Sequence, residues 1–187
     1  FFIWKQRNTI MFRAHKNHAN FKIIYGFHST PFGHCLIGIK DTDKAVLYLT
    51  FTDEDHKNGV ENLKNEWPLS ELEEDVSDET KNIIEKIFSP EASVDSSISV
   101  LLKGTEFQIE VWKSLMLIPK GTVITYEKVA SNIGKPKATR AVGNAVMKNN
   151  IAYLLPCHRV IGKSGNNKYK WGTKRKENIL TYESNYS

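Results

Sequence analysis

The chain has 187 residues, of which 40% are hydrophobic and 25% charged, and its formal net charge is +5. This composition is typical of a globular protein, and the length allows one domain or two small ones. The apolar stretches are too short to span a bilayer, so no membrane anchor or membrane partner is expected. The two cysteines, Cys35 and Cys157, lie in unlike settings, which argues against a disulfide framework and fits a reducing compartment.

The net charge hides an asymmetry along the chain. Residues 51–98 carry 4 basic and 14 acidic side chains, a net charge of −10, whereas residues 99–187 carry 15 basic and 5 acidic side chains, a net charge of +10. A basic half joined to an acidic segment favours a polyanion-binding face on the C-terminal side, although a lysine-rich solvated surface has the same composition.

Residues 1–20 show no clean period and are interpreted as an irregular arm. Three β-rich runs follow at 21–27, 34–40 and 45–51, separated by turn compositions, and predict an antiparallel meander. In the acidic segment, the spacing of Ile83, Ile84, Ile87 and Phe88 predicts a helix with one apolar face. Residues 21–98 are therefore expected to form a small α+β domain, an antiparallel sheet with a helix.

No zinc site is expected in this first domain. Cys35 is its only thiol and is interpreted as a core residue of its strand. The histidines in or near the domain are isolated, and such residues are more often surface or packing residues than ligands. They are His15, His18, His28, His34 and His56.

The pattern changes to helices in the second half, so residues 99–187 are expected to form a mostly α domain. Thr105 and Gln108 make a capping box, and apolar residues recur every four positions until PKG ends that helix. A short helix is expected from Tyr126 to Ile133, and another starts near Lys137. Two short helices around a tight turn indicate a winged helix-turn-helix-like motif.

The second of these short helices has two unlike faces. Its inward stripe is expected to contain Ala141, Val142, Ala145 and Val146. The opposite face carries Lys137, Arg140, Asn144 and Lys148, which can donate hydrogen bonds to phosphates and bases. This face predicts contact with nucleic acid, with a solvated polar face as the alternative.

Residues 151–164 contain the strongest candidate for chemistry. An apolar run leads into a proline, and Cys157, His158 and Arg159 follow without a gap. A thiol beside an imidazole and a guanidinium can be held as the reactive thiolate, because both neighbours favour the charged form. The alternative is that Cys157 is a small buried hydrophobe.

A last helix is expected from about Thr173 to Glu183. Its first turn is basic, with Lys174, Arg175 and Lys176, which is the wrong sign for a helix N-terminus. A phosphate partner would balance these charges, although tandem lysines on an exposed turn are common.

Several motifs of the second half occur together: Tyr126, KATRAVGNAV, Asn149, PCHRV, YKWG and Glu183. In combination they resemble the methylated-DNA protein-cysteine methyltransferases, also called O6-alkylguanine-DNA alkyltransferases, closely over residues 99–184 and loosely over 22–97. YGF, HCLIGI and YKWG resemble in particular the C-terminal half of the Ada-type bacterial members, where a regulatory segment precedes this unit. A preceding segment is therefore a hypothesis for this chain.

The resemblance implies direct reversal of DNA damage. The alkyl group of O6-alkylguanine, and of O4-alkylthymine, moves irreversibly to Cys157, once per molecule and without a cofactor. His158 takes the thiol proton through a water, Glu183 orients the imidazole, Asn149 orders the same network, and Tyr126 donates to the leaving guanine.

The resemblance also implies how DNA is bound. A monomer, in the bacterial cytoplasm or the eukaryotic nucleus, binds the minor groove of double-stranded DNA with the alkylated guanine flipped out, and Arg140 enters the stack. The DNA-binding residues implied are Arg140, Lys137, Asn144, Lys148, Arg159, Lys174 and Arg175. Those implied to line the substrate pocket are Tyr126, Val146, Pro156, Tyr169, Lys170 and Lys176.

The chain departs from the family between Cys157 and Tyr169. This stretch is one residue shorter than in related members, and Lys168 stands where glycine is usual. The resemblance therefore does not fix the width of the pocket, nor whether alkyl groups larger than methyl are accepted.

Two other functions fit parts of the sequence. A non-catalytic DNA-binding module explains the basic helix but not Cys157 in PCHRV. A thiol hydrolase explains Cys157 and His158 but leaves the basic helix-turn-helix without a role, and it requires an oxyanion hole.

Overall fold

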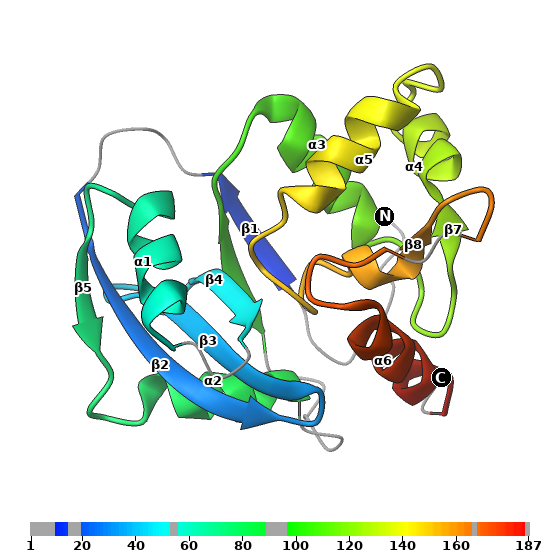
Figure 1. Cartoon of the computed structure of the whole chain (residues 1–187). Helices are drawn as coiled ribbons and strands as arrows, with labels where there is room; N and C mark the ends of the chain where they lie inside the picture. The colour runs from blue at the N-terminus through cyan, green and yellow to red at the C-terminus, as the bar shows by residue number, and fades with distance from the viewer. Residues whose placement is uncertain (1–9, 15–19, 53–55, 89–96, 166–167, 186–187) are drawn as a thin grey trace. The chain divides into compact units, whose positions relative to one another are not determined.

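The computed structural model describes residues 10–14, 20–52, 56–88, 97–165 and 168–185. The chain divides into two compact units between Lys103 and Gly104 (Figure 1).

The centre of the first unit is an antiparallel meander. Strands β2 (Lys22–Thr30), β3 (Gly33–Lys40) and β4 (Val46–Phe51) pair in sequence order, as the three β-rich runs predicted. Residues Cys35–Ile39 of β3 are all buried. A strand buried without alternation is covered on both faces of its sheet.

The sheet as a whole is mixed, so the expectation of a purely antiparallel sheet is wrong. Its order is β1-β6-β4-β3-β2-β5, and β5 (Glu71–Glu74) pairs parallel with β2, β6 (Ile98–Leu102) with β4, and β1 (Ile10–Ala14) with β6. Parallel neighbours require long connections, and such pairing leaves no local turn signal in the sequence.

This sheet includes two segments that the sequence analysis placed outside the first domain. Residues 10–14, expected in an irregular arm, form an edge strand whose partner β6 lies more than eighty residues away. Residues 99–102, expected in the C-terminal domain, belong to β6 and hence to the first unit.

Helices cover both faces of the sheet. α2 (Glu79–Phe88) is the helix predicted from the isoleucine spacing and buries Ile84, Ile87 and Phe88. α1 (His56–Glu66) was not predicted, because Gly59 lowers helix propensity. A Cβ built on Gly59 would lie 3.3 Å from Leu36, so a small residue suits this close contact.

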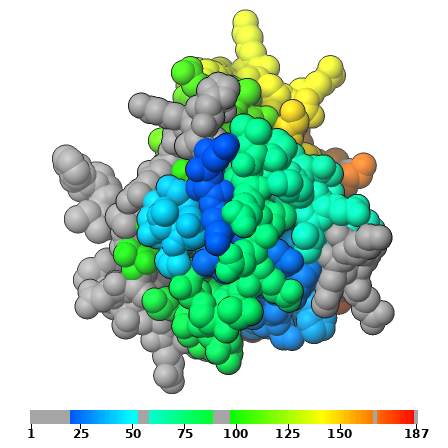
Figure 2. All heavy atoms as spheres, turned by 90° about the vertical axis from the view of Figure 1, so that its left-hand side faces the viewer, coloured from blue at the N-terminus to red at the C-terminus, as the bar shows by residue number. Residues whose placement is uncertain are grey.

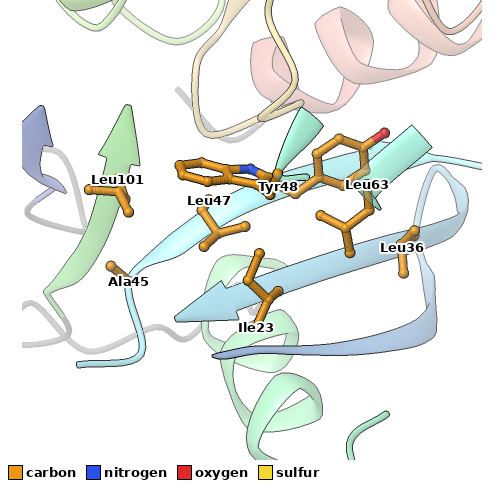
Figure 3. Packing of buried hydrophobic residues seen from close by; sticks show 8 residues of the cluster. Ile23, Leu36, Ala45, Leu47, Tyr48, Leu63 and Leu101 are labelled. Atoms are coloured by element: carbon orange, nitrogen blue, oxygen red, sulfur yellow. The ribbon is translucent and has the colours of Figure 1, made fainter. Parts of the chain in front are cut away.

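The core on the α1 side is a single cluster around Ile23, Leu36, Leu63 and Trp67 (Figure 3). Phe21 packs edge-on against Trp67, with ring centroids 5.4 Å apart. Parts of this unit, in blue, cyan and blue-green, lie side by side on the face shown in Figure 2.

The second unit begins with α3 (Glu106–Leu115), whose capping box is the one predicted. Thr105 Oγ1 accepts from the Gln108 amide, and the Gln108 side chain accepts from the Thr105 amide. Buried Trp112 donates from Nε1 to the carbonyl of Ala145 at 2.9 Å, which ties α3 to α5 (Thr139–Met147).

A tight turn links α4 (Tyr126–Asn132) to α5. Gly134 has φ +71°, a left-handed conformation that glycine adopts without strain and that ends α4. Strands β7 (Ile124–Thr125) and β8 (Val160–Ile161) pair in parallel, and the chain ends in α6 (Thr173–Asn185). Within the described residues, none of the helices has both the length and the apolar character needed to cross a bilayer.

Candidate active site

The segment between α5 and the 3₁₀ turn Cys157–Arg159 is organised by one buried amide, that of Asn149. Its Oδ1 accepts from the amide of Ile151 at 2.8 Å, and its Nδ2 donates to the carbonyl of Leu155 at 3.0 Å. Nδ2 also donates to Cys157 Sγ at 3.2 Å. Asn149 is fully buried, so these bonds form without competition from water.

Cys157 is 5% exposed, and its thiol is not a preformed thiolate. Burial raises its pKa to about 11, against the opposing effects of the Asn149 hydrogen bond and of the charges of Lys176 and Lys170. The expectation that His158 and Arg159 hold the thiolate is therefore wrong, because both of those side chains are engaged with Glu183. At neutral pH the thiol keeps its proton until a base accepts it.

The next residue along the chain, His158, can act as that base. His158 and Glu183 are both buried, and His158 Nε2 donates to Glu183 Oε1 at 2.9 Å. Since an ionised carboxylate only accepts, Nε2 carries the hydrogen, and Nδ1 of the neutral ring is the unprotonated nitrogen. Nδ1 is buried and has no hydrogen-bond partner among the residues that the structure describes.

Burial and charge set the protonation of this pair. Burial lowers the pKa of His158, in opposition to the hydrogen bond and charge of Glu183, which raise it. Burial raises the pKa of Glu183, but hydrogen bonds from His158 and Arg159 outweigh it and bring the value to about 2. At neutral pH the pair is therefore a neutral imidazole beside a carboxylate.

Arg159 completes this buried group, and its assignment to DNA binding is wrong. The side chain is 4% exposed, Nε and Nη2 donate to Glu183 at 2.9 and 2.7 Å, and Nη1 donates to the carbonyl of Ile118 at 2.6 Å. A guanidinium buried this way and bound to Glu183 and to the Ile118 carbonyl is not presented to phosphate.

Lys176 is another buried cation in this unit. The side chain is fully buried, and Nζ donates to the carbonyl of Val160 at 2.7 Å. Burial lowers its pKa, while the proximity of Cys157 raises it. Its effect on Cys157 is thus electrostatic.

Two further predicted residues lie within electrostatic range of Cys157. Burial raises the pKa of half-buried Tyr126, and Cys157 adds to the shift. The pKa of Tyr169 is raised for the same two reasons, and its buried hydroxyl has no hydrogen-bond partner in the described part of the chain. Lys170 Nζ donates to the Asn149 carbonyl at 3.1 Å and to Asn150 Oδ1 at 2.6 Å.

The rings of two tyrosines flank His158. Tyr153 stacks on the imidazole, with centroids 5.9 Å apart and planes 13° apart, and Tyr169 meets it edge-on at 6.4 Å. Tyr153 is not among the residues predicted from the sequence. The available signal was a single aromatic residue in the otherwise aliphatic run that precedes Pro156.

Helix α5 presents the polar face that its spacing predicted. Arg140 and Asn144 are exposed on α5, and Lys137 and Lys148 are exposed just before and after it. Val142, Ala145 and Val146 are buried as expected, but Ala141 is exposed, so the buried stripe is narrower than predicted.

The three basic residues in the first turn of α6 differ in their exposure to solvent. Lys174 is exposed, Arg175 is half-buried and donates to the carbonyl of Trp171 at 2.5 Å, and Lys176 is buried. The three charges therefore do not form one surface. Pro156, like Val146, is a buried side chain.

Among the residues that the structure describes, no three histidine, cysteine or acidic side chains gather closely enough to hold a metal ion. Cys35 is buried in β3, as expected for a core residue. His15 and His18 lie outside the described residues.

These features define the class of the protein. It is one that combines a buried cysteine, a neighbouring histidine–carboxylate pair and an exposed basic helix in one unit. The family model described as 6-O-methylguanine DNA methyltransferase, DNA binding domain, matches residues 106–185. A methylated-DNA–protein-cysteine methyltransferase of Methanosarcina mazei is 38% identical over 144 residues, which cover 76% of this chain and 87% of the relative.

Two further comparisons extend over both units. The bifunctional transcriptional activator/DNA repair enzyme Ada of Escherichia coli is 29% identical over 167 residues, covering 88% of this chain and 46% of Ada. The crystal structure of Mycobacterium tuberculosis OGT in complex with DNA matches with a TM-score of 0.62 at 28% identity, over 88% of this chain and 94% of that one. The chain belongs to the methylated-DNA–protein-cysteine methyltransferase family, which confirms the resemblance drawn from its motifs.

Proposed function

We propose that this chain repairs DNA by moving the alkyl group of O6-alkylguanine to the sulfur of Cys157, once per molecule. The observation that carries the proposal is the buried pair of His158 and Glu183, which leaves Nδ1 of the imidazole unprotonated next to the residue that bears the thiol. O4-alkylthymine is a second substrate of the same chemistry.

The reaction begins with removal of the thiol proton. Because the pKa of Cys157 is raised to about 11, the thiol needs a base, and the neutral imidazole of His158 accepts its proton at Nδ1 through a water. Glu183 stabilises the imidazolium that results, and the Asn149 amide and the charge of Lys176 stabilise the thiolate.

The thiolate then attacks the alkyl carbon in line with the bond to O6. The new carbon–sulfur bond forms as the carbon–oxygen bond breaks, and the electron pair of that bond stays on the purine. Tyr126 gives the purine a proton, so guanine leaves as a neutral base, and the proton held by His158 restores the tyrosine. The thioether is not hydrolysed, so each molecule reacts once.

The substrate base lies against side chains of the same unit. Val146 and Pro156 supply apolar surface, and the half-buried ring of Tyr169 forms a wall. The backbone of Lys170 donates to O6, and Lys176 acts through its charge.

DNA binding is assigned to residues 104–187, and the chain binds DNA as a monomer. Helix α5 enters the minor groove as the recognition helix of a winged helix-turn-helix-like motif, and Arg140 fills the space of the flipped base. Lys137, Asn144 and Lys148 contact the backbone, as do Lys174 and Arg175. A crystal structure of Mycobacterium tuberculosis OGT in complex with DNA supports the binding of DNA.

A duplex with tritium in the methyl group of O6-methylguanine tests the proposal. Irreversible transfer of one label per chain, found on the Cys157 peptide by mass spectrometry, is the expected result. Label that stays on the DNA indicates a lesion-binding module, and release of label to solvent with turnover of an ester substrate indicates a thiol hydrolase.

A further inference from the structure

Tyr153 has a backbone conformation that its side chain disfavours. Its φ is +65°, in the left-handed region where the Cβ of a bulky residue is crowded, and only Lys44 and Asp78 share this feature among the non-glycine residues that the structure describes. Such a conformation persists where the surroundings impose it, and it occurs often at functional sites.

The surroundings of Tyr153 are the braced turn that precedes the nucleophile. The amide of Leu155 donates to the carbonyl of Ile151 at 3.1 Å, and the amide of Leu154 donates to that of Ala152 at 2.7 Å. Asn149 holds both ends of this turn, through Ile151 and Leu155. The left-handed residue lies at the middle of the turn, and its ring lies against His158.

One hydrogen bond does not fix an imidazole. The bond from His158 Nε2 to Glu183 Oε1 holds a single atom, and the ring can still turn about it. The face of Tyr153 lies nearly parallel to the imidazole, with centroids 5.9 Å apart, and the edge of Tyr169 meets the imidazole from another direction, so the two rings together oppose such a turn. The position of Nδ1, the nitrogen that takes the proton, follows from the plane of the imidazole.

We propose that Tyr153 is a positioning residue for His158, whose ring aims Nδ1 and stabilises the protonated imidazole during alkyl transfer. The inference rests on the proposed function for its consequence in the reaction, but its effect on the imidazole is independent of any substrate. An aromatic face parallel to an imidazolium attracts the cation through its quadrupole.

The ring of Tyr153 acts among several other groups that face His158. Glu183 of α6 favours the protonated form, whereas burial and the charges of Arg159 and Lys176 oppose it. The ring of Tyr169 and the neighbouring thiol of Cys157 carry no charge before the reaction. Replacement of the Tyr153 ring by an aliphatic side chain keeps the imidazole buried and removes the attractive aromatic face, so it lowers the pKa of His158 and weakens it as a base.

Three substitutions in the full chain separate the ring from the turn. Tyr153→Phe keeps the ring, Tyr153→Leu removes the ring and keeps the strained backbone, and Tyr153→Gly removes both. The pKa of the His158 imidazole is measured by NMR titration without DNA, and the single-turnover rate of methyl transfer from O6-methylguanine DNA is measured against pH. Circular dichroism checks that each variant is folded.

Tyr153→Leu is expected to titrate His158 at lower pH, to slow transfer roughly three- to tenfold and to move the acidic limb of the rate profile to lower pH. Tyr153→Gly also admits water and relieves the burial of the imidazole, so it is expected to titrate His158 above the leucine variant and still to slow transfer, because the ring that aims Nδ1 is gone. Tyr153→Phe, which keeps the ring, is expected to leave the titration of His158 as in the wild type. An unchanged titration in all variants overturns the proposal, as does a glycine variant that behaves like wild type or a phenylalanine variant as impaired as leucine. Because the titration needs no transfer, it tests the role of Tyr153 even if the wild-type chain transfers nothing.

Discussion

Cys35 and Cys157 are both buried, and burial raises the pKa of both, to about 12 and about 11. Cys35 lies in β3 between His34 and Leu36, and the one effect that opposes the rise in its pKa is a backbone hydrogen bond with His28. Cys157 accepts a hydrogen bond from Asn149 and lies within range of two lysine charges and next to a histidine–carboxylate pair. Burial alone therefore does not distinguish a core cysteine from a nucleophile; the hydrogen-bonding and charged side chains around Cys157 do.

The largest difference between the two cysteines is expected when each thiol is removed in turn. Cys157→Ala is expected to abolish transfer of tritium from O6-methylguanine DNA, because no other group supplies the sulfur. DNA binding, measured by fluorescence anisotropy, is expected to stay within a few fold. Cys35→Ala is the matched control and is expected to transfer one label per chain; failure of this variant while folded would place the reactive sulfur in the first unit.

A second variant removes the carboxylate behind Cys157 and leaves its shape. Glu183→Gln is expected to slow transfer by on the order of 10²- to 10⁴-fold, because the imidazolium loses its stabilising charge. Single-turnover kinetics measure the effect. Glu177→Gln, on the exposed side of the same helix, is the control, and equal rates for the two variants would contradict the role of the pair.

The same carboxylate gives the second unit a pH-dependent stability. The pKa of Glu183 is about 2 in the folded chain against 4.5 for the free group, so its contribution, about 3 kcal/mol, is complete above pH 4.5 and is lost as the pH falls towards 2. The difference in urea stability between wild type and Glu183→Gln is expected to shrink over this range. A constant difference would mean that Glu183 titrates normally.

The smallest effect is expected for Arg140, an exposed residue of α5. Arg140→Ala is expected to slow transfer from duplex DNA about tenfold, the loss of a contact of about 1.4 kcal/mol. Transfer from the free O6-methylguanine base is expected to change much less, because no flipped nucleotide has to be held. Lys113→Ala, an exposed basic residue of α3, is the control; slowing of both substrates alike would argue against base extrusion.

Local signals in the sequence predicted several elements correctly. The meander β2–β4, the capping box at Thr105, the apolar face of α2 and the polar face of α5 all follow from spacing or from residues three or four apart. The parallel strands β1, β5 and β6 were missed because their partners are far along the chain. α1 was missed because Gly59 is needed for packing and not for helix formation.

The motifs around Cys157 indicated the family and the reactive sulfur, because the order PCHRV and the exposed basic helix are properties of the chain itself. Tertiary structure decided where the charges act: adjacency to Cys157 suggested that Arg159 helps to hold the thiolate, yet its guanidinium is bound to Glu183 and to the Ile118 carbonyl within the core. The same burial contradicts the DNA contact that the family resemblance implied for Arg159. Tertiary structure also decided that Tyr153 lies on His158. Burial and long-range partners determine protonation and orientation, and neither can be read from neighbours in sequence.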